Sequence, residues 1–173
     1  MCNFITLFAQ RLAVLISNSR AAHRDHDHDR CRAAALAQAR GLCRNRKVRF
    51  TSSRETILRL IWTGHRPVGA YALIEQLAAE QGHRVLPPTV YRALDFLLAQ
   101  GLIHRIASRN AFIGCPFPEV PHHNLFLLCR SCGAVAECCA VPLDQAIAAT
   151  AERAGFSVTG HNLEIEGLCH QCR

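Results

Sequence analysis

The sequence lacks several features that would place it in common protein classes. No stretch reaches the roughly 18 apolar residues that a transmembrane helix needs, so no membrane span is expected. The front half has neither a nucleophile elbow nor a glycine-rich phosphate loop, which argues against the corresponding enzyme classes. Charged residues make up 19% of the 173 residues and hydrophobic ones 50%, a balance that excludes wholesale disorder. A folded chain of one domain, or of two small ones, is expected.

Acidic residues are scarce at the front of the chain. Residues 1–54 hold 11 basic and 3 acidic side chains, whereas residues 112–173 hold 3 basic and 6 acidic ones. The formal net charge of +7 is therefore carried by the N-terminal part. This asymmetry predicts that a polyanion, with nucleic acid as the first candidate, meets the N-terminal part only.

The first 17 residues lack the basic region and the cleavage site of a signal peptide, and Gln10 and Arg11 interrupt their apolar run. We interpret residues 1–30, with the His/Asp tract at 23–29, as a disordered extension with a solvated tail. A cytoplasmic location follows. In that reducing compartment the ten cysteines are expected to hold metal rather than form disulfides.

Four helices are predicted between residues 31 and 101. The first is alanine-rich and covers 31–43, and the second opens on a capping box formed by Ser52 and Glu55. The third runs over about 69–81, and the residues expected on its buried face are Tyr71, Ile74, Leu77 and Ala78.

The fourth helix, PPTVYRALDFLLAQG, starts with proline and stops at glycine. Val90, Leu94 and Leu97 form a buried stripe at helical spacing, whereas Arg92 faces away from it. Two short β-rich runs follow, separated by a turn at 108–110. Three helices and a hairpin after a basic start predict a winged helix-turn-helix, whose last helix enters a DNA major groove.

Three prolines at 116, 118 and 121 mark a hinge. The residues after it predict a strand at 125–128, a helix at 143–154 and strand-like runs at 156–158 and 162–166. The expected fold is α+β, with an extension (1–30), a winged-helix DNA-binding domain (31–114), a hinge (115–121) and a small αβ dimerisation and metal-binding domain (122–173). Such a small second domain needs a metal, a partner subunit or both.

Two C-x-x-C pairs lie in this second domain. Four thiolates close a tetrahedral zinc site and leave no position open for catalysis, so a structural zinc is predicted. Redox-active pairs are the alternative, and two pairs at the ends of one domain argue against them. The predicted ligands are Cys129, Cys132, Cys169 and Cys172.

The combination of winged helix, proline hinge and split cysteine clasp resembles the ferric uptake regulator family. The motifs that carry the likeness are PPTVYRALDFLLAQGLIHR, CRSCGAVAE and GHNLEIEGLCHQC. Within the family the chain is most similar to the zinc-sensing members. The resemblance implies a second, regulatory zinc at the hinge, and therefore two zinc ions per subunit. The residues that match its ligands are His104, Cys115, His122 and Glu137.

The chain departs from iron-sensing relatives, which carry a longer His/Asp-rich run before the first cysteine pair. Here only His122 and His123 remain, and a histidine of those relatives is replaced by Pro67. Zinc sensing is therefore expected, with an iron, manganese or peroxide sensor of the same family as the alternative. A further metal site using His123 or His161 is also considered, since His161 matches a histidine common in the family.

The resemblance implies a homodimer on a palindromic double-stranded DNA operator, repressing zinc-uptake genes, with no membrane and no small-molecule substrate. Tyr91 is expected against a thymine methyl and Arg92 on a guanine edge, although Tyr91 as a packing aromatic and Arg92 on phosphate remain open. Thr89 is also expected to contact DNA. Four basic residues are expected on the DNA backbone: Arg44, Arg46, Lys47 and Arg49. A zinc-clasped enzyme or thiol oxidoreductase is the rival interpretation, and we expect no enzymatic activity.

Overall fold

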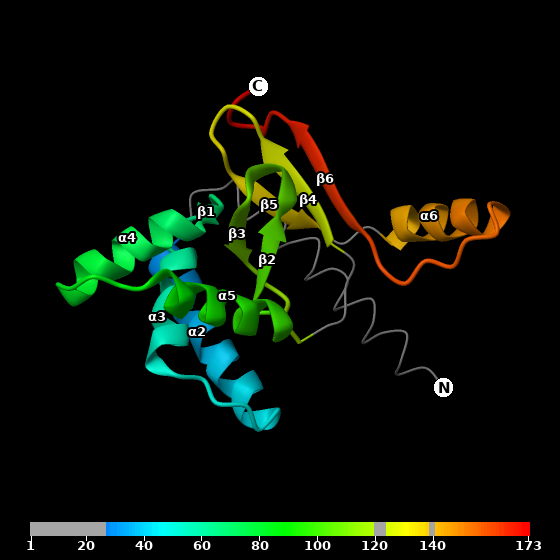
Figure 1. Ribbon diagram of the computed structural model, residues 1–173. Helices are drawn as coiled ribbons and strands as arrows, with labels where there is room; N and C mark the ends of the chain where they lie inside the picture. The colour runs from blue at the N-terminus through cyan, green and yellow to red at the C-terminus, as the bar shows by residue number, and fades with distance from the viewer. Residues whose placement is uncertain (1–26, 120–123, 139–140) are drawn as a thin grey trace. The chain divides into compact units, whose positions relative to one another are not determined.

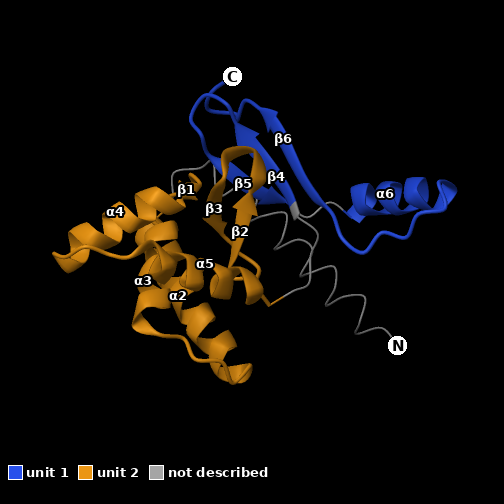
Figure 2. Ribbon diagram, in the orientation of Figure 1, with its two compact units in different colours: residues 1–24, 121–173 blue, residues 25–120 orange. Residues whose placement is uncertain are grey.

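The computed structural model describes residues 27–119, 124–138 and 141–173 (Figure 1). Within these ranges the chain forms two compact units, 27–119 and the described residues after 121 (Figure 2). No helix in the described ranges combines the length and the apolar character needed to cross a bilayer. The predictions for residues 1–26, for His122 and for His123 lie outside the described residues.

Four helices build the N-terminal unit: α2 (His28–Asn45), α3 (Ser52–Ile61), α4 (Ala70–Gln81) and α5 (Pro87–Ala99). Helix α2 starts three residues before the predicted position. The Asp27 carboxylate accepts hydrogen bonds from the backbone N–H groups of Asp29 and Arg30, at 3.0 and 3.1 Å. A side chain that satisfies these otherwise unpaired groups fixes a helix start. The end of the His/Asp tract is therefore a helix cap and not part of a tail.

Two local predictions in this unit are wrong. Helix α3 is capped by Thr51, which accepts from the Arg54 N–H at 3.4 Å, and Glu55 pairs with Arg40 instead of closing a box with Ser52. Helix α4 turns Tyr71 outward, 76% exposed, because the buried positions are Ala70, Leu73 and Leu77. The rest of the predicted face is confirmed, since Leu77 is buried and Ile74 and Ala78 pack half-buried against the core. Tyr71 lies at the edge of this apolar stripe, on the side away from Ala70 and Leu73, and is therefore left in solvent.

A small antiparallel sheet completes the unit. Its strands are β1 (Val68–Gly69), β2 (Ile103–Ile106) and β3 (Ala111–Gly114), in the order β1-β3-β2. The β2–β3 hairpin is the predicted wing, and β1 was not predicted from its two residues. Gly114 has no room for a side chain, since a Cβ there would lie 2.2 Å from the Trp62 indole. The indole thus packs directly on the backbone at the end of β3.

One apolar core joins the helices and the wing strands. The stripe predicted on α5 is confirmed: Val90, Leu94 and Leu97 are all fully buried. Side chains from α3 and α4 pack on the same cluster, as do Leu102, directly before β2, and Ile103, its first residue. The core therefore holds α5 by one face and leaves its opposite face at the surface.

The C-terminal unit contains β4 (Asn124–Cys129), β5 (Val135–Cys138), α6 (Val141–Arg153) and β6 (Asn162–Gly167). The sheet order is β5-β4-β6, with β4 antiparallel to β5 and parallel to β6. Strand β5 was not predicted, and residues 156–158 form no strand. Helices followed by a hairpin, and then a small αβ unit, confirm the predicted α+β class.

Candidate functional site

The four predicted zinc ligands are brought together by the pairing of β4 with β6. These strands are parallel, and Cys129 at the end of β4 stands opposite Gly167 at the end of β6. The Arg130 N–H donates to the Gly167 carbonyl at 2.9 Å and extends the pairing past the strand end. Because parallel strands end at the same edge, the C-x-x-C pair after each strand lies at that edge. Cys169 follows only two residues after β6.

Each pair is held in a tight turn. The Gly133 N–H donates to the Cys129 carbonyl at 3.0 Å, and the Cys172 N–H donates to the Cys169 carbonyl at 3.0 Å. The four sulfurs all lie within 4.8 Å of one another, and those of Cys132 and Cys169 are 3.9 Å apart. Tetrahedral zinc with Zn–S bonds of about 2.3 Å requires sulfurs roughly 3.8 Å apart. The cluster therefore fits a closed four-thiolate zinc site.

The electrostatics of the cluster favour thiolate. The backbone N–H groups of Cys132 and Cys169 hold the pKa of the Cys129 thiol down to about 5, and the Cys169 N–H lies 3.4 Å from its sulfur. Hydrogen bonds donated to a charged group stabilise the charged form. Cys129 is therefore ionised at neutral pH, which is the state a metal requires of its ligand.

Two of the predicted regulatory ligands lie side by side in the N-terminal unit. His104 is on β2 and Cys115 follows β3, and the ring and the sulfur offer ligand atoms within 4.8 Å of each other. The Cys115 N–H donates to the Leu102 carbonyl at 3.0 Å, which continues the β2–β3 pairing by one bond. Cys115 is buried. An imidazole and a thiol at this spacing can share one metal ion.

The other two predicted regulatory ligands belong to the C-terminal unit. Glu137 lies on β5 opposite Phe126 and is buried, which is unusual for a carboxylate and typical of one that meets a positive charge. His122 is outside the described residues. Both remain predictions as ligands.

The histidine proposed for a further metal site has a carboxylate neighbour. The His161 Nε2 atom lies 2.9 Å from an Asp144 carboxylate oxygen. This contact joins the residue directly before β6 to the first turn of α6. Sequence reasoning missed this contact, because nothing in a separation of 17 residues signals it. A carboxylate beside a histidine orients the ring, whether or not the other nitrogen binds a metal.

The surface of α5 carries the predicted DNA contacts. Thr89, Tyr91 and Arg92 are all exposed, Tyr91 at 43%. They lie in the first two turns of the helix, outside the buried stripe: Arg92 faces away from the core, and Thr89 and Tyr91 lie on the two flanks. A half-exposed tyrosine on the free face of a helix can reach a groove, and this placement does not support the alternative that Tyr91 packs inside its own unit.

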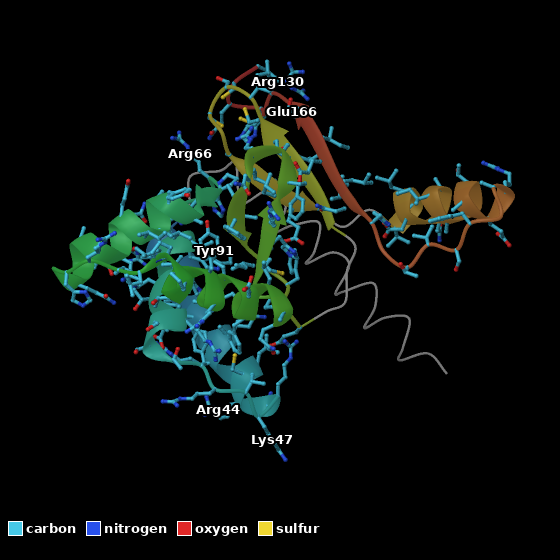
Figure 3. All side chains as sticks on the ribbon, in the orientation of Figure 1. Arg44, Lys47, Arg66, Tyr91, Arg130 and Glu166 are labelled. Atoms are coloured by element: carbon cyan, nitrogen blue, oxygen red, sulfur yellow. The ribbon has the colours of Figure 1, made fainter. Side chains whose placement is uncertain are left out.

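The four basic residues at and after the C-terminal end of α2 do not behave alike. Arg44, Lys47 and Arg49 are exposed, and Figure 3 shows Arg44 and Lys47 extending outward at the C-terminal end of α2. Arg46 is exposed as well, but its guanidinium donates to the backbone carbonyls of Gln100 and Pro118. The sequence does not signal these contacts, since the partners lie far along the chain.

Comparisons with known proteins agree with this architecture. Residues 45–166 match the model of the ferric uptake regulator family. The zinc uptake regulation protein of Escherichia coli (strain K12) is 39% identical over 138 residues, 79% of this chain and 80% of the relative. The ferric uptake regulation protein of Campylobacter jejuni is 28% identical over 140 residues, 79% of this chain and 87% of the relative.

A solved structure of a zinc uptake regulator complexed with zinc and DNA is also similar. It aligns with a TM-score of 0.75 at 37% identity, covering 81% of this chain and 93% of that one. The family match spans well over half of the 173 residues and includes both units. The chain is therefore a member of the ferric uptake regulator family.

Proposed function

We propose that this protein is a zinc-responsive, DNA-binding transcriptional repressor of zinc-uptake and zinc-homeostasis genes, and that it is not an enzyme. The observation that carries the proposal is that His104 and Cys115 offer ligand atoms within 4.8 Å of each other near the C-terminal end of the winged unit. The same unit contains α5, a helix with one face buried in the core and the other exposed. The similarity to a zinc uptake regulator solved with zinc and DNA supports the proposal that this protein binds zinc and DNA. A cytoplasmic location is part of the proposal.

The proposed regulatory site takes His104, Cys115, His122 and Glu137. Two imidazoles, one thiolate and one carboxylate suit tetrahedral zinc, and the thiolate disfavours ions that prefer oxygen ligands. In sequence, His104 precedes the segment 115–121 whereas His122 and Glu137 follow it. Binding by all four residues would restrain this segment and reduce the conformational cost of DNA binding. DNA would then tighten zinc binding by the same factor.

The four-cysteine cluster takes the second zinc ion of each subunit. Its role is to hold the end of β6 and the C-terminus against β4, since a closed site has no position for substrate. The geometry of the sulfurs and the ionised state of Cys129 support this assignment.

We infer a homodimer joined through the C-terminal unit. No residue of the described helix α6 is buried, although the helix is amphipathic. Leu127 and Ile165 stand side by side on β4 and β6 and are exposed, as is Phe156 after α6. Exposed apolar surface of this extent on a small unit marks an interface. Two-fold symmetry would present two recognition helices to a palindromic operator.

On DNA, Tyr91 and Arg92 are proposed to meet base edges in the major groove, with Thr89 beside them. Arg92 can donate two hydrogen bonds to a guanine, and Tyr91 can contact a thymine methyl. Arg44, Lys47 and Arg49 are proposed to contact phosphates, which adds salt-dependent affinity without sequence information.

The direct test is Cys115→Ser in the full-length protein. DNA affinity is measured with the structural zinc alone and after further zinc is added. The wild type should gain affinity on zinc addition, and the variant should lose most of that gain, because a hydroxyl is a poor zinc ligand. Cys31→Ser, a half-buried cysteine on α2, is the matched control and should behave as wild type. An unchanged gain in Cys115→Ser would remove this residue from the switch.

The same assay decides between zinc and the alternative ions. The similarity to a ferric uptake regulation protein keeps an iron sensor as the second candidate, together with manganese and peroxide sensors. Each ion is added in turn to protein that retains its structural zinc. A larger gain in DNA affinity with Fe(II) or Mn(II) than with zinc would reassign the sensor.

A further inference from the structure

Arg46 connects three parts of the N-terminal unit that are far apart in sequence. It lies directly after α2, as the capping residue at the C-terminal end. One terminal nitrogen of its guanidinium donates to the Gln100 backbone carbonyl at 2.6 Å and is 3.3 Å from the Gln100 side-chain oxygen. The other terminal nitrogen donates to the Pro118 carbonyl at 3.3 Å. Gln100 is the cap of α5, and Pro118 lies in the segment after the wing.

The chemistry of both acceptors suits an arginine. The last carbonyls of a helix have no intrahelical partner and carry partial negative charge, so a cation at the end of α5 is favourable. A guanidinium is planar and directs donors to two sides at once, whereas an ammonium is a point charge. One arginine can therefore bridge the helix end and the segment, and a lysine cannot hold both in the same geometry.

Two connections link the segment of residues 115–118 to the region where α5 ends: one direct backbone hydrogen bond and one through Arg46. At its start, the Cys115 N–H donates to the carbonyl of Leu102, two residues after the helix cap. At its end, Arg46 holds the Pro118 carbonyl. Within it, the Phe117 N–H donates to the Cys115 sulfur at 3.3 Å. A segment held at one point can rotate about that point, whereas two ties fix its direction relative to the helix.

We propose that Arg46 is a positioning residue that links residues 115–118 to the recognition helix α5. When zinc binding at Cys115 fixes these residues, Arg46 then fixes the position of the helix as well. This inference rests on the proposed function, in which Cys115 is a regulatory ligand and α5 enters the groove. It replaces the expectation that Arg46 contacts DNA phosphate, because both terminal nitrogens of its guanidinium are directed to carbonyls of its own unit. Without Arg46, zinc binding at Cys115 would restrain the segment but no longer the helix.

The experiment compares wild type, Arg46→Ala, Arg46→Lys and Arg44→Ala as full-length proteins. Operator affinity is measured with structural zinc only and with added zinc, each at several salt concentrations. Arg44 is the matched control, since it is an exposed arginine in the last turn of the same helix. Thermal unfolding and amide hydrogen exchange of residues 117 and 119 are measured on the same samples.

If Arg46 positions the helix, the factor by which zinc raises operator affinity should be at least about fivefold smaller in both Arg46 variants than in wild type. Fivefold is the lower end of the usual range for coupling between two binding sites. Their salt dependence stays that of wild type, and exchange at 117 and 119 becomes faster. Arg44→Ala keeps the full zinc-induced gain, but its affinity falls in both zinc states and its salt slope falls by about 1.

Two results would overturn the inference. The first is an unchanged zinc-induced gain in Arg46→Ala. The second is a reduced salt slope in Arg46→Ala with affinity restored by lysine, which identifies a phosphate contact. Loss of folding in the alanine variant leaves Arg46→Lys, which keeps the charge, to decide. Failure of the proposed function looks different, because wild type itself would then show no gain with zinc, and the inference would fall with it.

Discussion

The two units of this protein are stabilised in different ways. In the N-terminal unit, helices α2 to α5 and the wing strands share one apolar core that reaches from Ala39 to Phe112. In the C-terminal unit, the described buried residues are few, and two of them, Cys129 and Cys169, belong to the thiolate cluster. Helix α6 contributes no buried residue. The first unit can therefore stand on hydrophobic burial, whereas the second has little buried apolar surface of its own, which is why the proposed function gives it a structural zinc and a partner subunit.

This division matches what each unit does in the proposed function. A DNA-reading helix needs a rigid base, and a buried stripe on α5 provides one without using its outer face. A dimerising unit keeps apolar surface for its partner and so has less for its own core. Metal binding then supplies folding free energy that the small core does not.

Removing one thiolate should have the largest effect on the difference between the two units. Cys132→Ser should unfold the C-terminal unit, because structural zinc contributes about 10–16 kcal/mol of apparent binding free energy. Hydrogen exchange should show lost protection in β4 and β6 and retained protection in α3 and α5. Cys31→Ser is the control for the atom change. Retained protection in β4 would show that the sheet does not need the clasp.

The reverse experiment weakens the apolar core. Leu94→Ala removes a side chain that is 1% exposed and should lower the free energy of unfolding of the N-terminal unit by about 2–5 kcal/mol. Denaturation followed by fluorescence of Trp62, the one tryptophan of the chain, measures it directly. Zinc content should be unchanged. Leu86→Ala, at a position 62% exposed, should change the same quantity by less than about 0.5 kcal/mol.

The smallest effect is expected at an ion pair near the clasp. The Arg130 Nε atom lies 3.6 Å from the Glu166 Oε2 atom, and both side chains are exposed (Figure 3). Arg130→Ala should change the stability of the C-terminal unit by about 0–1 kcal/mol, since water and salt screen exposed pairs. Zinc retention against a chelator is the measurement. A loss of zinc as complete as in Cys132→Ser would make this pair part of the clasp.

Sequence patterns predicted the elements with strong periodicity or sharp punctuation. The buried stripe of α5 and its proline and glycine boundaries needed no tertiary information, and the cysteine spacing was enough to predict the cluster. The failures have physical causes. Tyr71 lies at the edge of the apolar stripe of α4, and strand β5 forms because it pairs with the edge of β4. The cap at Asp27 was hidden in a tract whose composition resembles a tail.

Both kinds of stabilisation could be predicted from the amino-acid sequence, because apolar spacing and cysteine pairs are local features. The partner of each polar group, by contrast, is set by the folded arrangement of the chain. Arg46 reaches Gln100 and Pro118, and His161 reaches Asp144, because folding brings distant segments to within hydrogen-bonding range. A charged side chain has no periodicity that names its partner, so such contacts depend on geometry that no short stretch of sequence contains.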